Sequence, residues 1–63
     1  MRGERPEALP QLPWGIRRAL QRGGYRTRTA VARASDAELL ALHGMGPVRL
    51  AQLRRLIPYE AAP

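Results

Sequence analysis

The C-terminal third of the chain most constrains the fold, because signals for two helices and a turn between them follow one another directly. Ser35-Asp36-Ala37-Glu38 has the form of a capping box, in which serine and glutamate side chains satisfy free N–H groups at a helix start. Gly44 and Gly46 then permit a tight reversal. Pro47 suits the first turn of a second helix, and Pro58 ends that helix. The segment therefore predicts two short helices joined by a hairpin at residues 43–46.

Apolar spacing in this segment predicts which faces are buried. Three leucines supply the inward face of the first helix, which we expect to end near His43-Gly44: Leu39, Leu40 and Leu42. Spacings of three and four give the second helix an apolar stripe, which runs to its end at Ile57: Leu50, Leu53, Leu56 and Ile57. We expect Met45 to point inward and tie the hairpin to both helices.

Two further helices are expected in the N-terminal half. Trp14–Arg22 forms an amphipathic helix with Pro13 in its first turn, and Gly23-Gly24 ends it. Ile16, Ala19 and Leu20 form its apolar face, and we expect Trp14 to cover the small core. Thr27 is a candidate N-cap for a helix that runs to about Ala34. A strand is the competing interpretation for that last segment, because it contains threonines and Val31.

The size of the chain limits it to one domain. A chain of 63 residues buries only about 60% of its unfolded surface, and small domains often add disulfides or a metal ion. With no cysteine and only His43 as histidine, neither is expected, and no cofactor is expected. We expect an all-α bundle of four short helices at residues 12–57, between a flexible arm (1–11) and a frayed tail (58–63).

Neither a membrane span nor a secretory signal is expected. No run of residues approaches the roughly 18 apolar positions of a spanning helix. The N-terminal residues lack the apolar core of a signal peptide. The absence of cysteine fits a reducing compartment. We therefore expect a cytoplasmic protein with no membrane partner.

The charge points to a polyanionic partner. All eleven basic residues are arginine, against five acidic residues, and residues 12–57 hold nine arginines but only two acids. Nucleic acid is the first polyanion to expect for a small domain this basic. The two acids, Asp36 and Glu38, lie in the capping box, where the helix dipole favours negative charge. With these acids explained, one histidine and no cysteine, an enzyme is not expected.

The segment SDAELLALHGMGPVRLAQL resembles a helix-hairpin-helix motif. With RALQRGGYRT included, residues 16–57 resemble the C-terminal domain of the bacterial RNA polymerase alpha subunit. They are closer still to small stand-alone bacterial proteins of that SAM-like group, which are labelled DNA-binding. The resemblance implies a compact helical domain whose hairpin meets the phosphate backbone of duplex DNA across the minor groove.

The resemblance also implies the residues that bind DNA. Backbone amides of the hairpin and nearby arginines would contact phosphates, with little or no sequence specificity, from these positions: Gly44, Met45, Gly46, Val48, Arg49, Arg17 and Arg18. Two positions depart from the family pattern. Val48 stands where many such hairpins carry a basic residue, and Gly15 is nearest the arginine with which the polymerase domain enters the groove.

Several alternatives remain open at this point. Gly44-Met45-Gly46 can serve simply as a turn between helices, and Arg17 and Arg18 can form a solvated face. Helical modules of this type also dock protein partners, including components of transcription or repair assemblies. A lone motif binds weakly, so pairing in a weak homodimer or with a larger partner is consistent with the sequence. Arg54 and Arg55 are expected to complement a helix end.

Overall fold

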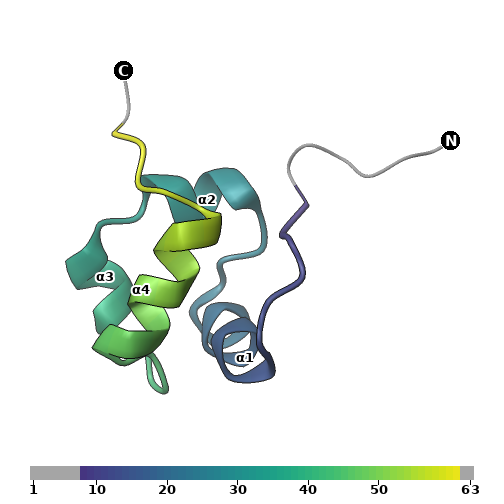
Figure 1. The fold of residues 1–63 in the computed structure, drawn as a ribbon, viewed down its shortest axis with the longest axis vertical. Coiled ribbons are helices and arrows are strands. Elements are labelled where there is room, and N and C mark those ends of the chain that lie inside the picture. Colours follow the sequence, from purple (N-terminus) through teal and green to yellow (C-terminus); the bar gives the residue numbers. More distant parts are fainter. Residues whose placement is uncertain (1–7, 62–63) are drawn as a thin grey trace, which may run out of the picture.

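Four helices form the regular structure of residues 8–61, the part of the chain that the computed structural model describes (Figure 1). They are α1 (Trp14–Gly23), α2 (Arg28–Arg33), α3 (Asp36–Leu40) and α4 (Pro47–Leu56). Within these residues there is no strand, so the helical prediction for the segment after Thr27 is confirmed and the alternative of a strand is wrong. No helix in this part of the chain is long and apolar enough to cross a membrane.

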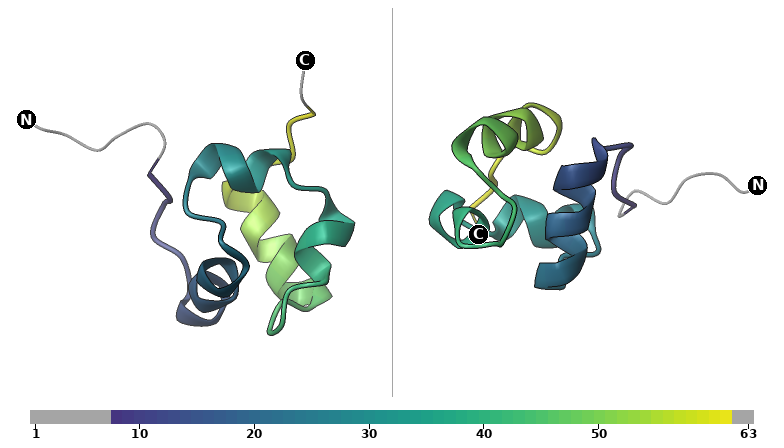
Figure 2. Two further views of the ribbon diagram at one scale, coloured as in Figure 1. Left: turned by 180° about the vertical axis from the view of Figure 1, so that it is seen from behind. Right: turned by 90° about the horizontal axis from the view of Figure 1, so that it is seen from below.

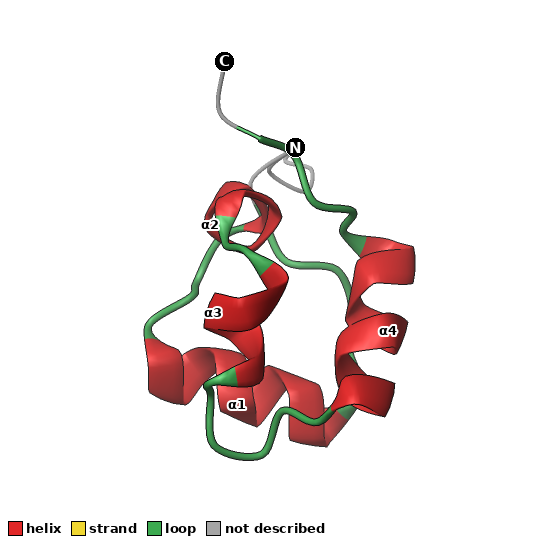
Figure 3. Cartoon of the chain, turned by 90° about the vertical axis from the view of Figure 1, so that its left-hand side faces the viewer, coloured by secondary structure: helices red, strands yellow, loops and turns green. Residues whose placement is uncertain are grey.

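The fold is built on the pair of helices α3 and α4, and α1 crosses one end of this pair. Helices α3 and α4 lie side by side, α1 crosses one end of this pair, and α2 lies at the other end (Figure 3). The loop between α3 and α4 lies at the same end of the molecule as α1 in all views (Figures 1 and 2). The first described residues run beside α1. This arrangement brings the α3–α4 loop against α1.

Helix α1 ends at the predicted glycines. Gly24 has φ +84°, in the left-handed region that favours glycine. The Gly24 N–H donates to the carbonyl of Gln21 at 3.1 Å, and the Tyr25 N–H donates to that of Leu20 at 2.9 Å. These two bonds form a Schellman motif, which satisfies carbonyls at the helix end. Pro13 differs slightly from the prediction, because it is the N-cap residue just before the helix.

The two shortest helices begin at the predicted caps. The Thr27 hydroxyl accepts from the N–H of Ala30 at 3.1 Å. At the start of α3, the Ser35 hydroxyl accepts from the N–H of Glu38 at 3.0 Å, and the Glu38 carboxylate accepts from the N–H of Ser35 at 2.8 Å. The capping box is therefore confirmed. Such short helices need these caps, because isolated helices below about 12 residues are marginal in water.

Helix α3 is shorter than predicted. It ends at Leu40 and not near His43-Gly44, so the connecting loop spans residues 41–46. The Leu42 N–H donates to the carbonyl of Leu39, three residues back, at 3.1 Å, which tightens and ends the last turn. Gly44 then reverses the chain with φ +89°.

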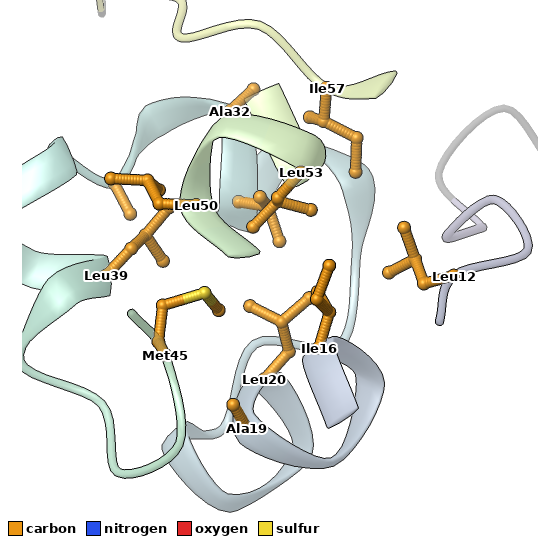
Figure 4. Packing of buried hydrophobic residues seen from close by; sticks show 12 residues of the cluster. Leu12, Ile16, Ala19, Leu20, Ala32, Leu39, Met45, Leu50, Leu53 and Ile57 are labelled. Carbon is orange, nitrogen blue, oxygen red and sulfur yellow. The ribbon is translucent and has the colours of Figure 1, made fainter. Parts of the chain in front are cut away.

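Twelve buried apolar side chains form one core (Figure 4). They come from all four helices and the segments between and beside them: Leu12, Ile16, Ala19, Leu20, Val31, Ala32, Ala34, Leu39, Met45, Leu50, Leu53 and Ile57. Met45 is 5% exposed and points into the core as predicted, with the end of its side chain toward Leu20. None of the buried residues in the described chain is polar or charged. The hairpin residue Met45 is therefore part of what holds the loop in place.

Three apolar residues predicted to be inward are exposed. Leu40 and Leu56 are 41% and 45% exposed, because each lies about 100° around its helix from the neighbour that takes the inward position, Leu39 or Ile57. Trp14 is 72% exposed and does not cover the core. It precedes Ile16 by two residues, about 200° around the helix, so its ring points away from the core that Ile16 enters.

The segments that flank the helices also contact the folded part. Leu12 is buried, and Leu9, predicted to lie in the flexible arm, packs against the core. The prediction for residues 1–7 lies outside the described residues. Residues 58–61 form no helix, yet the Glu60 N–H donates to the carbonyl of Ala32 at 2.8 Å. This part of the expected frayed tail is therefore attached to α2.

Candidate nucleic-acid interface

The α3–α4 loop and the start of α4 lie along a stripe of small residues on α1. A Cβ added to Gly15 would lie 2.8 Å from Cζ of Arg49, and one added to Gly23 would collide with the side chain of Leu42. Between these positions, a Cβ added to Gly44 would lie 4.0 Å from the Cβ of Ala19. Because Gly15, Ala19 and Gly23 are spaced by four, they share one side of α1. That spacing is the sequence signal for this contact, which the periodicity of large apolar residues does not reveal.

Arg49 links the α3–α4 loop to α4, and its guanidinium lies against α1. Its side chain leaves the first turn of α4, and Nη1 donates to the carbonyl of Gly44 at 2.7 Å. The guanidinium lies in the space that a side chain at Gly15 would fill. Arg49 of α4 therefore places a cation beside Gly15 of α1. Arg49 is also exposed, so its remaining N–H groups face solvent.

The N-terminus of α4 has open backbone donors. Gly46 is the N-cap residue, and it supplies no side-chain cap. The first helical bond is the Leu50 N–H to the carbonyl of Gly46, at 2.9 Å. Among residues 8–61 no acceptor is present for the N–H groups of Gly46, Val48 and Arg49. A Cβ added to Gly46 would meet nothing within 4 Å, so solvent has open access to this backbone.

The predicted hairpin residues contribute in different ways. Gly44 and Gly46 can contribute only backbone atoms to the interface. The side chain of Met45 is buried and cannot reach a ligand. The Met45 N–H is used within the loop, because it donates to the carbonyl of Leu42 at 3.1 Å. Val48 is 73% exposed and carries no charge.

The structure separates the two arginines that the sequence groups on α1. Arg18 lies about 60° around the helix from Gly15, the residue that faces Arg49, and Arg22 lies about 20° from it. Both therefore share the flank of α1 that faces the loop. Arg17 lies about 200° from Gly15 and lines a hollow with residues 8–12, Tyr25 and Arg26. Arg22, which the sequence prediction did not include, is better placed than Arg17 to extend the loop site.

The described residues carry a large excess of unpaired positive charge. They contain nine arginines and three acids, and the structure has one ion pair among them, between Arg54 Nε and Asp36 Oδ1 at 2.8 Å. Glu38 is held in its capping box. Eight of these nine arginines therefore have no carboxylate partner within residues 8–61. The electrostatic potential around this part of the chain is consequently positive.

Arg54 has a structural role that exceeds the prediction for it. Its Nη1 donates to the carbonyls of Val31 at 3.1 Å and Ile57 at 3.4 Å, and Nη2 donates to that of Ala34. It therefore complements the C-terminal ends of both α2 and α4 and bridges to Asp36 of α3. The side chain of Arg55 is exposed and makes no hydrogen bond with residues 8–61. Arg54 holds three helices together.

The comparisons with known proteins add no family. No family model, curated protein or solved structure matched this chain, so its function is inferred from its own residues. The likeness to the polymerase domain stays a prediction. Within the described residues no group of three or more histidine, cysteine or acidic side chains could hold a metal ion.

Proposed function

We propose that the chain is a non-enzymatic helix-hairpin-helix module that binds the phosphate backbone of duplex DNA near the minor groove. The observation that carries the proposal is the joint placement of the open N–H groups of α4 and the Arg49 guanidinium at one loop. Little or no sequence specificity is expected, since contacts to phosphates carry affinity without sequence information.

The chemistry of this loop suits a phosphate oxygen. The helix dipole adds partial positive charge to the N–H groups at the start of α4, which is a favourable place for an anion. Gly46 has no Cβ, so a phosphate can approach the backbone closely. Arg49 spends one donor on Gly44 and can offer others in a charge-assisted bond.

The arginines around the loop support the same partner. Arg18 and Arg22 extend the positive surface from the loop along one flank of α1. Charges of this kind attract DNA of any sequence and give an affinity that falls as salt rises. Because several such contacts act together, no single arginine is expected to carry the whole affinity.

A protein-interaction module that docks onto a transcription or repair assembly is the second candidate function. The observation in its favour is the 73% exposed side chain of Val48 beside the loop. Burial of an exposed apolar side chain against a protein partner is favourable, whereas this side chain offers nothing to a phosphate. Such an interface would respond far less to salt than a phosphate contact.

Fluorescence anisotropy of a labelled DNA duplex at several salt concentrations tests the proposal. The logarithm of the association constant should fall by about 0.9 per neutralised phosphate for each unit of log salt concentration. Arg49→Gln should weaken binding and make that slope shallower by about 0.9. Arg33→Gln is the matched control, since it removes the same charge from an exposed residue of α2, at the other end of the molecule.

Three outcomes would overturn the proposal. These are the absence of duplex binding at low salt, equal effects of Arg49→Gln and Arg33→Gln, and an affinity independent of salt. The last result, together with loss of partner binding in Val48→Ser, would favour the protein-interaction module.

A further inference from the structure

An exposed tryptophan stands on α1 outside the loop site. Trp14 is the single tryptophan of the chain and is 72% exposed. The guanidinium of Arg18, one helical turn on, lies over its ring at 4.9 Å from the ring centroid. Trp14 contributes nothing to the twelve-residue core. A large aromatic ring is thus exposed to solvent, with a guanidinium over it, and takes no part in the packing of the core.

Polar and charged side chains surround this ring on the same helix. Trp14, Arg17, Arg18 and Gln21 line a shallow open hollow of about 350 Å³. A second hollow of about 290 Å³ continues it along the helix, lined by Arg18, Gln21 and Arg22. No acidic residue lies in α1. The solvent face of α1 therefore combines one aromatic plane with three cations and one amide.

This combination fits an unpaired nucleobase on a polyanionic strand. Arg18 covers part of the ring, and the remaining exposed surface is open to a stacked base. Stacking of a base on an aromatic side chain is worth about 1–3 kcal/mol. Arginines beside the ring can bind the phosphates that flank the base, and Gln21 can reach its polar edge. An apolar protein partner fits less well, because the other exposed large apolar residues lie on α3, on α4 and after it.

We propose that this face of α1 binds single-stranded polynucleotide by stacking an unpaired base on Trp14. Inside a duplex both faces of each base are covered by neighbouring bases, so the ring can stack only on a single strand or a frayed end. The inference goes beyond the proposed duplex contact and does not depend on it. The stacking site centres on Trp14, while the duplex site centres on the loop backbone and Arg49, and Arg18 and Arg22 border both.

Intrinsic fluorescence tests the stacking directly, because all indole emission comes from Trp14. The protein is titrated with a thymine-only DNA strand, a uracil-only RNA strand, a blunt duplex and a thymidine mononucleotide. Single strands should quench the emission at concentrations where anisotropy shows binding, and the duplex should quench it much less. Quenching by both strands or by either one supports the proposal, and the comparison identifies the preferred sugar.

Variants test the contribution of the ring to affinity. Trp14→Ala should weaken single-strand binding by about 5- to 150-fold, the loss of one stacked base. Trp14→Phe, which keeps a ring, should recover part of this affinity. Tyr59→Ala is the matched control, because Tyr59 is also exposed but lies beside Arg54. Circular dichroism checks that each variant keeps its helices.

The proposal would be overturned by unchanged emission when a single strand is bound, or by equal single-strand affinity of wild type and Trp14→Ala. Equal quenching by the mononucleotide at the same base concentration would also overturn it. That result would mean that the arginines add no contact to the phosphates that flank a base in a strand. Failure of the duplex proposal has a different signature. It would remove duplex binding and leave the quenching by single strands intact.

Discussion

At the residue scale, Arg54 and Arg49 show how two arginines on one helix take different roles. The side chain of Arg54 is 14% exposed and its donors point to backbone carbonyls and to Asp36, which is a structural arrangement. Arg49 is exposed, and one of its N–H groups donates to the carbonyl of Gly44 in the loop. The sequence prediction assigned Arg49 to DNA and Arg54 to a helix end, but it missed the contacts of Arg54 with α2, since those two carbonyls lie 23 and 20 positions away, at Val31 and Ala34.

Removal of Arg54 should strongly destabilise the fold. Arg54→Ala leaves carbonyls at the ends of α2 and α4 without their donor, and we expect a loss of about 2–3 kcal/mol in the free energy of unfolding. Arg54→Lys should restore little, because one ammonium cannot reproduce the guanidinium fork. Urea denaturation measures the free energy of unfolding of Arg54→Ala and Arg54→Lys. Arg55→Ala, the exposed neighbour, should change stability by less than about 0.5 kcal/mol. Equal losses for Arg54→Ala and Arg55→Ala would contradict this role.

At the element scale, helix starts were well predicted, while the end of α3 and the inward faces of the helices were predicted less well. Thr27, Ser35 and Pro47 mark helix starts through local hydrogen bonds or backbone geometry, and those signals lie within a few residues of sequence. The exposure of Leu40 and Trp14 depends on how each short helix is rotated against the others. Five residues of α3 are too few for periodicity to fix that rotation. The resemblance implied that the start of α1 lies beside the hairpin, but apolar periodicity did not predict this contact, because it depends on residues without large side chains.

Gly15 in α1 and Gly24 at its C-terminal end should respond differently to substitution by alanine. Gly24→Ala places a Cβ at φ +84° and should lower the free energy of unfolding by about 1–2 kcal/mol. Gly15→Ala lies within the helix, where alanine is favoured by up to about 1 kcal/mol. Its Cβ meets only the movable end of Arg49, so we expect no loss of stability. Thermal unfolding measures both variants. Destabilisation by Gly15→Ala equal to that by Gly24→Ala would show that the contact with Arg49 is rigid.

At the scale of the whole molecule, the excess positive charge lowers the stability of the fold, while it favours the proposed binding of DNA. A core of twelve apolar residues in a 63-residue chain supports only about 3–5 kcal/mol of stability. Self-repulsion among unpaired arginines reduces this further. The net charge follows from composition, and the helix caps and apolar spacing predicted the all-α class. The distribution of charge over the flanks of α1 required the structure, because it depends on which side of the helix faces the loop.

Salt should therefore move stability and DNA affinity in opposite directions. Between about 0.01 M and 0.15 M the screening length falls from about 30 Å to about 8 Å, which weakens repulsion across the whole domain. We expect the melting temperature to rise over this range while duplex affinity falls. A melting temperature that falls with salt would mean that attractive pairs such as Arg54–Asp36 outweigh the repulsion.

The central claim, that the backbone at the start of α4 is the anion site, is tested most directly by duplex affinity of Gly46→Asp at low salt. Aspartate is a good N-cap at this open position, so the variant should fold with stability equal to or a few tenths of a kcal/mol above wild type. Its carboxylate should occupy the N–H groups and repel phosphate, which should weaken binding by about tenfold or more. Gln52→Glu, the same charge change at an exposed site in the middle of α4, should weaken it by about threefold or less. Equal duplex affinity of folded Gly46→Asp and wild type would contradict the account.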